Sequence, residues 1–266
     1  MEMLKVTQLS KVFNPNTINE NRVFDKLSLD VSKGDFISII GSNGAGKSTL
    51  LNMISGTIQA DSGSILLDGK EVINKPEYIR SRSIGRVFQD PSKGVAPNMT
   101  ILENIALADN KGKKYGLSLG INKKRIDYYK EMISEVNLGL EDKIHNKVQL
   151  LSGGQRQALT LLMSVMSKPK LLLLDEHTAA LDPKTSEKIM EITRKIVKES
   201  GITTLMVTHN LKHAMENGNR LFMMHRGEIL ADIKGDEKKK LDTNSLLELF
   251  ERANGEQTIS DRTLFG

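Results

Sequence analysis

The chain contains no cysteine, which excludes disulfide bonds and thiolate metal sites. It also lacks an apolar run approaching the roughly 18 residues that a membrane-spanning helix needs. Residues 1–5 do not lead into the apolar core of a signal peptide, and no internal repeat is visible. We therefore expect a protein that stays in the cytoplasm.

The composition sets wide limits. With 266 residues, of which 38% are hydrophobic, the chain is long enough for one large domain or two small ones. The net charge of +5 is compatible with a nucleic acid, an anionic membrane surface or a nucleotide as partner, so charge does not choose among them.

Residues 41–48 fit the phosphate-binding pattern G-x-x-x-x-G-K-[ST] without a mismatch. A β-branched apolar run at 36–40 predicts a buried strand before this loop, and residues 49–54 can open a helix after it. Lys47 would reach the β- and γ-phosphates and Ser48 would ligate Mg²⁺, whereas a glycine-rich turn that matches by chance is the alternative. The predicted nucleotide-binding residues are Gly41, Ser42, Asn43, Gly44, Ala45, Gly46, Lys47, Ser48 and Thr49.

A second chemical site follows four consecutive leucines at 171–174, where Asp175 and Glu176 end a predicted strand. A carboxylate at the end of a buried strand is costly unless a cation or ligand satisfies it. We interpret Asp175 as the Mg²⁺ partner and Glu176 as the group that polarises the attacking water. The alternative is a strand capped by two solvated acids.

The rest of the pattern is mixed α/β. Residues 4–9 and 23–31 alternate apolar and polar positions and predict an antiparallel hairpin, with another strand at 63–67. Residues 100–167 are mainly helical, strands return at 171–174 and 203–208 around a helix at 184–199, and the end of the chain is polar.

Residues 151–155 read Leu-Ser-Gly-Gly-Gln, and with the phosphate loop and the acidic strand they resemble the ATP-binding cassette family over about residues 3–235. The resemblance implies a Q-loop glutamine at Gln89, a D-loop aspartate at Asp182 and a switch histidine at His209. It also implies adenine stacking on Phe13. Gln89 would bridge Mg²⁺ or the attacking water to the partner that docks on the helical subdomain. Each of these residues has an ordinary alternative. Phe13 could be a core aromatic, Gln89 a loop glutamine and His209 a hydrogen-bonded structural residue.

The signature itself has a physical reading. Ser152 can cap a helix so that the backbone N–H groups of Gly153 and Gly154 form a second phosphate-binding surface, although a plain capped helix start would look the same. The resemblance implies a head-to-tail homodimer in which Ser152, Gly153, Gly154 and Gln155 of one subunit close over the ATP of the other.

One position departs from the family, because His177 stands where proline usually follows the glutamate.

These observations predict an α/β fold with a P-loop NTPase core and a mixed sheet, an N-terminal antiparallel β subdomain and an inserted helical subdomain. We expect one nucleotide-binding domain over residues 1–240, with the helical subdomain at about 93–167, and a C-terminal tail over 241–266.

The function expected from the resemblance is ATP hydrolysis that powers solute import through a separate permease dimer. Such a subunit lies on the cytoplasmic face of the membrane, meets an extracytoplasmic solute-binding protein indirectly and needs no nucleic acid. Alternatives are an export or extraction complex, a soluble cassette acting on ribosomes or DNA, and a regulator that binds without hydrolysing. The interval from 89 to 151, with an extra helical stretch, resembles amino-acid or nucleoside-type importers, and Val95 and Met99 suit a groove for a permease helix.

Overall fold

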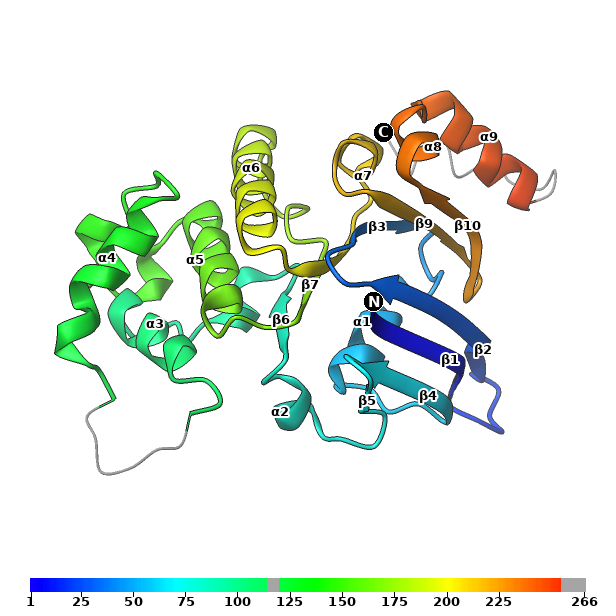
Figure 1. Cartoon of the computed structure of the whole chain (residues 1–266), viewed down its shortest axis with the longest axis horizontal. Coiled ribbons are helices and arrows are strands. Elements are labelled where there is room, and N and C mark those ends of the chain that lie inside the picture. The colour runs from blue at the N-terminus through cyan, green and yellow to red at the C-terminus, as the bar shows by residue number, and fades with distance from the viewer. Residues whose placement is uncertain (114–119, 255–266) are drawn as a thin grey trace. The chain divides into compact units, whose positions relative to one another are not determined.

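The computed structural model describes residues 1–113 and 120–254. It forms two compact units, which we call the terminal unit (Met1–Ser81 with the chain from Gly201 onward) and the central unit (Arg82–Ser200). Figure 1 labels their helices and strands. Over the described ranges, no helix combines the length and apolar character needed to cross a membrane.

The terminal unit contains an antiparallel sheet in which the strand order is β2-β1-β4-β5 (Figure 1). The predicted hairpin is confirmed, since buried Val6 pairs with buried Leu29 and the tip holds Asn14 and Asn16 at positive φ, which asparagine tolerates. The strands are β1 (Glu2–Phe13), β2 (Asn21–Ser32), β4 (Ser62–Leu67) and β5 (Lys70–Glu71).

A mixed sheet in the same unit has the strand order β10-β9-β3-β8. β3 (Phe36–Gly41) runs parallel to both neighbours, β8 (Thr203–Val207) and β9 (Arg220–His225), while β10 (Glu228–Lys234) is antiparallel to β9. All six residues of β3 are buried. A central strand covered on both faces needs a continuous apolar run, which is the pattern that predicted it.

Helices cover the mixed sheet of the terminal unit. An apolar cluster joins Ile40, which precedes the phosphate loop, with Leu211 and with fully buried Leu246. The C-terminal helices therefore pack near the end of the strand that carries the loop, beside α7 (Figure 1). The helices of the whole terminal unit are α1 (Lys47–Ser55), α2 (Glu77–Arg80), α7 (Leu211–Glu216), α8 (Gly235–Lys239) and α9 (Thr243–Asn254). The final residues of the expected tail, 255–266, lie outside the described residues.

The central unit is built on two parallel strands, β6 (Ile84–Val87) and β7 (Leu171–Asp175). The four leucines of β7 have no exposed surface. The mainly helical stretch predicted between the strands is confirmed, and a long helix follows β7. The helices are α3 (Ile101–Asp109), α4 (Ile126–Ser134), α5 (Gly153–Met166) and α6 (Pro183–Ser200).

Candidate active site

The phosphate loop connects β3 to α1 in the terminal unit, and two of its glycines are required by close packing. Gly46 caps α1 with φ 96°, and a Cβ there would lie 2.8 Å from the Phe24 ring. At Gly41 a Cβ would lie 2.1 Å from the carbonyl oxygen of Met224. Neither distance is tolerable for a real Cβ, so the loop keeps its course because both positions lack a side chain.

Lys47 begins α1 and is 5% exposed. Its Nζ donates to the carbonyl oxygens of Gly41 at 2.6 Å and Ser42 at 2.9 Å, which holds the ammonium over the loop. Ser48 and Thr49 follow in the first turn of the helix. A cation, a positive helix end and a glycine-rich backbone together suit the phosphate chain of a nucleotide.

His209 leaves the same sheet at the edge where the phosphate loop begins. β3 and β8 are parallel, Ile39 pairs with Val207, and the Thr208 N–H donates to the Ile39 carbonyl at 3.1 Å. The next residue, Asn210, caps α7 by accepting from the His213 N–H at 3.0 Å. Parallel pairing therefore brings His209 and the loop to one sheet edge.

Phe13 is half-buried at the end of β1. The Lys11 Nζ lies 5.4 Å from its ring centroid and also pairs with Asp61 at 2.7 Å. The Phe13 ring thus has the ammonium group of Lys11, from the same strand, as a neighbour. Adenine stacking on Phe13 stays a prediction.

In the central unit, Asp175 is 9% exposed at the end of β7. Its carboxylate lies 3.5 Å from the Arg86 guanidinium, which also stacks on the Phe88 ring at 4.4 Å. The sequence reasoning missed Arg86. A basic residue inside an otherwise apolar strand was the available signal, because a buried guanidinium needs a carboxylate or carbonyl partner.

Glu176 is half-buried and adopts a left-handed conformation with φ 48°. It starts a tight turn in which the Ala179 N–H donates to the Glu176 carbonyl at 3.0 Å. Gln89 is exposed two residues beyond β6. Since Val87 pairs with Leu174 in parallel strands, the chain reaches Gln89 and the two acids at the same edge of the pair.

The signature residues begin α5 with the cap that the sequence predicted. Ser152 Oγ accepts from the Gln155 N–H at 3.2 Å, and the Gln155 side chain accepts from the Ser152 N–H at 3.2 Å. The Gln155 amide also donates to the Leu138 carbonyl at 3.0 Å. This reciprocal cap fixes the helix start and leaves its positive end for an anion.

Asp182 precedes α6 and accepts from the Thr185 N–H at 3.1 Å. Hydrogen bonds from Thr185 lower the pKa of Asp182. Thr185 also packs on the signature, because a Cβ at Gly154 would lie 2.2 Å from its Cγ2. The second signature glycine is thus a point of close approach between α5 and α6.

Two further contacts were invisible in the sequence. The amide of Gln157, in α5, donates to the Phe88 carbonyl at 3.3 Å and ties the signature helix to the residue before Gln89. In the terminal unit, the Ser42 hydroxyl lies 3.4 Å from His225 Nδ1 at the end of β9. Both join residues far apart in the chain, which no local pattern reports.

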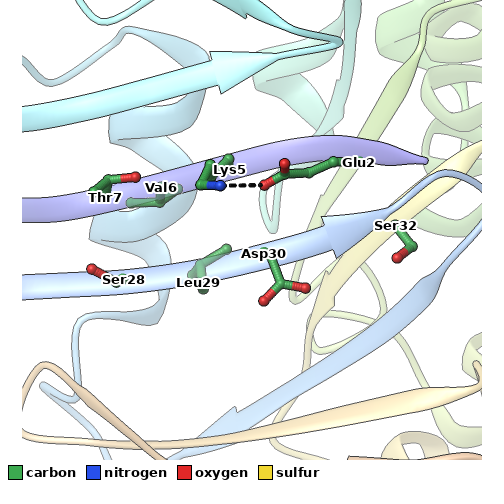
Figure 2. Close-up of a pocket in the computed structure, with 8 residues that line it drawn as sticks. All are labelled: Glu2, Lys5, Val6, Thr7, Ser28, Leu29, Asp30 and Ser32. Carbon is green, nitrogen blue, oxygen red and sulfur yellow. Dashed lines mark ion pairs between the residues drawn. The ribbon is translucent and has the colours of Figure 1, made fainter.

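A groove of about 530 Å³ also lies over β1 and β2 (Figure 2). Its lining combines charged and small polar side chains with the apolar Val6 and Leu29, and Glu2 and Lys5 form an ion pair at 3.5 Å within it. None of the predicted nucleotide-site residues lines this groove. It is a surface of the hairpin rather than part of the candidate site.

Comparison with known proteins agrees with this geometry. The family model for ABC transporters matches residues 24–179. A tyrosine transport ATP-binding protein of Clostridioides difficile (strain R20291) is 53% identical over 94% of this chain and 100% of its own length. A xylose/arabinose import ATP-binding protein of Sulfolobus acidocaldarius is 36% identical over 84% of each chain.

Solved structures give the same answer. A dimeric ATP-binding cassette in a post-hydrolysis state, bound to ADP and phosphate, superimposes with a TM-score of 0.75 at 30% identity and covers 87% of this chain and 98% of that one. A nucleotide-free cassette of an ABC transporter gives a TM-score of 0.76 at 28% identity over 94% and 99%. The phosphate loop, the acidic strand and the capped signature therefore belong to an ATP-hydrolysing cassette, and the chain is a member of the ABC transporter family as its ATP-binding subunit.

Proposed function

We propose that this chain is the ATPase of an importer for tyrosine or a closely related amino acid, working as a pair beneath separate permease subunits. The observation that carries the proposal is the 53% identity with the tyrosine transport ATP-binding protein, which extends over all of that protein. Import-type relatives for other solutes also match, at lower identity. The solute class follows from the relative, since a cassette subunit does not itself touch the solute.

The proposed reaction is hydrolysis of MgATP. Lys47 neutralises the β- and γ-phosphates, and Glu176 accepts a proton from the attacking water. Gln89 contacts the metal or the attacking water, and His209 contacts the γ-phosphate. The Ser48 hydroxyl, the Gln89 amide oxygen and the Asp175 carboxylate are the hard oxygen ligands that Mg²⁺ prefers, so the residues fit the ion. Bound there, Mg²⁺ would neutralise charge developing on the phosphates.

Two copies are proposed to enclose ATP head to tail. The signature of one subunit, with Ser152 at its cap, would close over the nucleotide held by Lys47 of the other, and Asp182 would face the same interface. The capped start of α5 and the dimeric cassette with ADP and phosphate support this arrangement. Hydrolysis would open the dimer and so drive the permease.

The proposed permease surface is a groove of about 550 Å³ in the central unit, which we call the α3–α4 groove. Apolar side chains dominate its lining, and Leu107 is 50% exposed there. The lining residues are Met99, Leu102, Glu103, Leu107, Gly120, Ile121, Lys123, Ile126 and His145. An exposed apolar groove on a helical unit suits an amphipathic helix from a partner.

The α3–α4 groove is joined to the Q-loop by a short, well-tied segment. Buried Asn104 in α3 accepts from the Ala96 N–H at 2.7 Å and donates to the Ala96 carbonyl at 3.0 Å. Met99 lines the groove, whereas the lining does not include Val95. Movement at Gln89 would therefore reach the groove through residues 90–100.

The test combines transport and ATPase assays. Leu107→Glu and Met99→Glu should leave the ATPase activity of the purified protein intact but abolish tyrosine uptake and co-purification with the permease. Ile18→Glu is the control, because Ile18 is fully exposed at the tip of the β1–β2 hairpin. Uptake that survives the groove variants, tyrosine efflux instead of uptake, or a protein pool bound mainly to ribosomes would contradict the proposal.

A further inference from the structure

His177 occupies a buried position directly after the proposed catalytic glutamate. Its side chain is 2% exposed, and its Nε2 lies 3.1 Å from the hydroxyl of Thr193, which has no exposed surface. Thr193 lies ten residues into α6, so the bond joins the turn after β7 to the middle of a long helix. A buried hydrogen bond of this kind restricts both partners.

The direction of the bond follows from the second contact of the threonine. Thr193 Oγ1 donates its own proton to the Ile189 carbonyl at 2.8 Å, one helical turn earlier. The hydroxyl must then accept from the imidazole, so Nε2 of His177 carries the proton. The helix backbone thereby fixes the hydroxyl, and the hydroxyl fixes the ring.

Glu176 needs such an anchor because its backbone is unfavourable. A glutamate at φ 48° lies in the left-handed region, which costs free energy for any residue with a side chain and persists only where the surroundings impose it. His177 is the second residue of the turn that Glu176 begins. Proline at this position would restrict the turn through its ring, whereas histidine can restrict it only through a side-chain contact.

We propose that His177 and Thr193 form a positioning pair that holds Glu176 in its left-handed conformation by tying the turn to α6. The carboxylate of Glu176 then points in one direction when water and nucleotide arrive. Neither residue touches the reacting atoms in this scheme. The inference rests on the proposed role of Glu176 as the base.

The experiment measures kcat and KM for MgATP in purified protein. Thr193→Val removes the acceptor at nearly constant volume, and Thr193→Ser restores a hydroxyl. Thr204→Val is the matched control, since buried Thr204 bonds through its hydroxyl only to the nearby Ile202 carbonyl among the described contacts. Glu176→Gln is measured alone and combined with Thr193→Val.

The expected result is a loss of about tenfold in kcat for Thr193→Val with KM within about twofold, because a misplaced base slows chemistry without weakening nucleotide binding. Thr193→Ser should recover most of the rate, and Thr204→Val should match the wild type. In the Glu176→Gln background, Thr193→Val should have no further effect, because the pair acts through the carboxylate.

Three outcomes would overturn the inference. Wild-type kcat in Thr193→Val beside an inactive Glu176→Gln would show that the pair is structural only, and equal losses in Thr193→Ser and Thr193→Val would show that packing matters rather than the bond. Full turnover in Glu176→Gln would show that Glu176 is not the base, and the pair would then have no base to position. If Thr193→Val does not fold, His177→Leu and His177→Gln replace the valine and serine variants, since glutamine keeps an N–H near the position of Nε2.

Discussion

The guanidinium of Arg86 lies 3.5 Å from the carboxylate of Asp175, joining two neighbouring parallel strands at the edge where the acids leave the sheet. Both side chains are about nine-tenths buried, at 10% and 13% exposure, so water screens the pair little. The arginine therefore supplies positive charge at the carboxylate that is proposed to bind Mg²⁺.

We expect Arg86→Met to lower the free energy of unfolding by about 3 kcal/mol, because it leaves the buried carboxylate without this cation. MgATP should then raise the Tm of the variant more than that of the wild type, since the metal replaces the lost charge. Differential scanning calorimetry with and without MgATP measures both effects. Arg22→Met is the control, because the Arg22–Asp25 pair is exposed. Equal MgATP shifts in Arg86→Met and the wild type would contradict the expectation.

Glu176→Gln should bind MgATP normally and hydrolyse it at least about 100-fold more slowly, because the amide cannot accept the proton of the attacking water. The ATP-bound homodimer should accumulate, as hydrolysis no longer opens it. Gel filtration with ATP and phosphate release measure the two effects. Unchanged turnover would refute the assignment of Glu176 as base.

His177→Pro should keep most of the activity, within about threefold of the wild type, because proline at the second turn position restricts φ in place of the lost side-chain bond. His177→Ala supplies neither restraint and should be about tenfold slower. Steady-state ATPase rates compare the two. A proline variant as slow as Glu176→Gln would mean that the ring takes part in catalysis.

Stability should depend on pH through Lys238. Burial lowers the pKa of this lysine from 10.5 to about 8, and its Nζ donates to the carbonyl oxygens of Asn217 and Gly218. Between about pH 8 and pH 10.5, Lys238 is protonated in the unfolded chain and largely deprotonated in the folded one, so the unfolded chain binds more protons. The contribution of Lys238 to stability therefore rises from pH 8 to pH 10.5 and is lost as pH falls through 8.

Denaturant titrations from pH 7.5 to 10.5 should show this rise, with a slope of at most about 1.4 kcal/mol per pH unit, as the difference between the wild type and Lys238→Met. Lys239→Met is the matched control, because the neighbouring lysine is exposed and pairs only at the surface with Asp236. A wild-type profile parallel to that of Lys238→Met would show that Lys238 does not titrate in this range.

Local sequence patterns predicted the elements and the candidate chemical groups. The phosphate loop was readable because its glycines, lysine and serine lie within eight consecutive residues and are needed at fixed spacing. The same holds for the start of the signature helix, where the sequence predicted the Ser152 cap; the structure adds the reciprocal bond from Gln155, three residues further on. The hairpin and the helices between β6 and β7 followed from apolar periodicity, and the buried β3 followed from a continuous apolar run, because both patterns record burial along one segment.

Tertiary structure decided what depends on residues distant in the chain. Arg86 meets Asp175 across 89 positions, His177 meets Thr193 across 16, and Leu246 is buried in a cluster with Ile40. Such contacts are set by strand pairing and by the packing of whole elements, and periodicity within one segment carries no information about its neighbour. The sequence therefore predicted which groups would perform the chemistry. The fold decided which partners hold them, because a side chain is kept in one position only by residues from other elements.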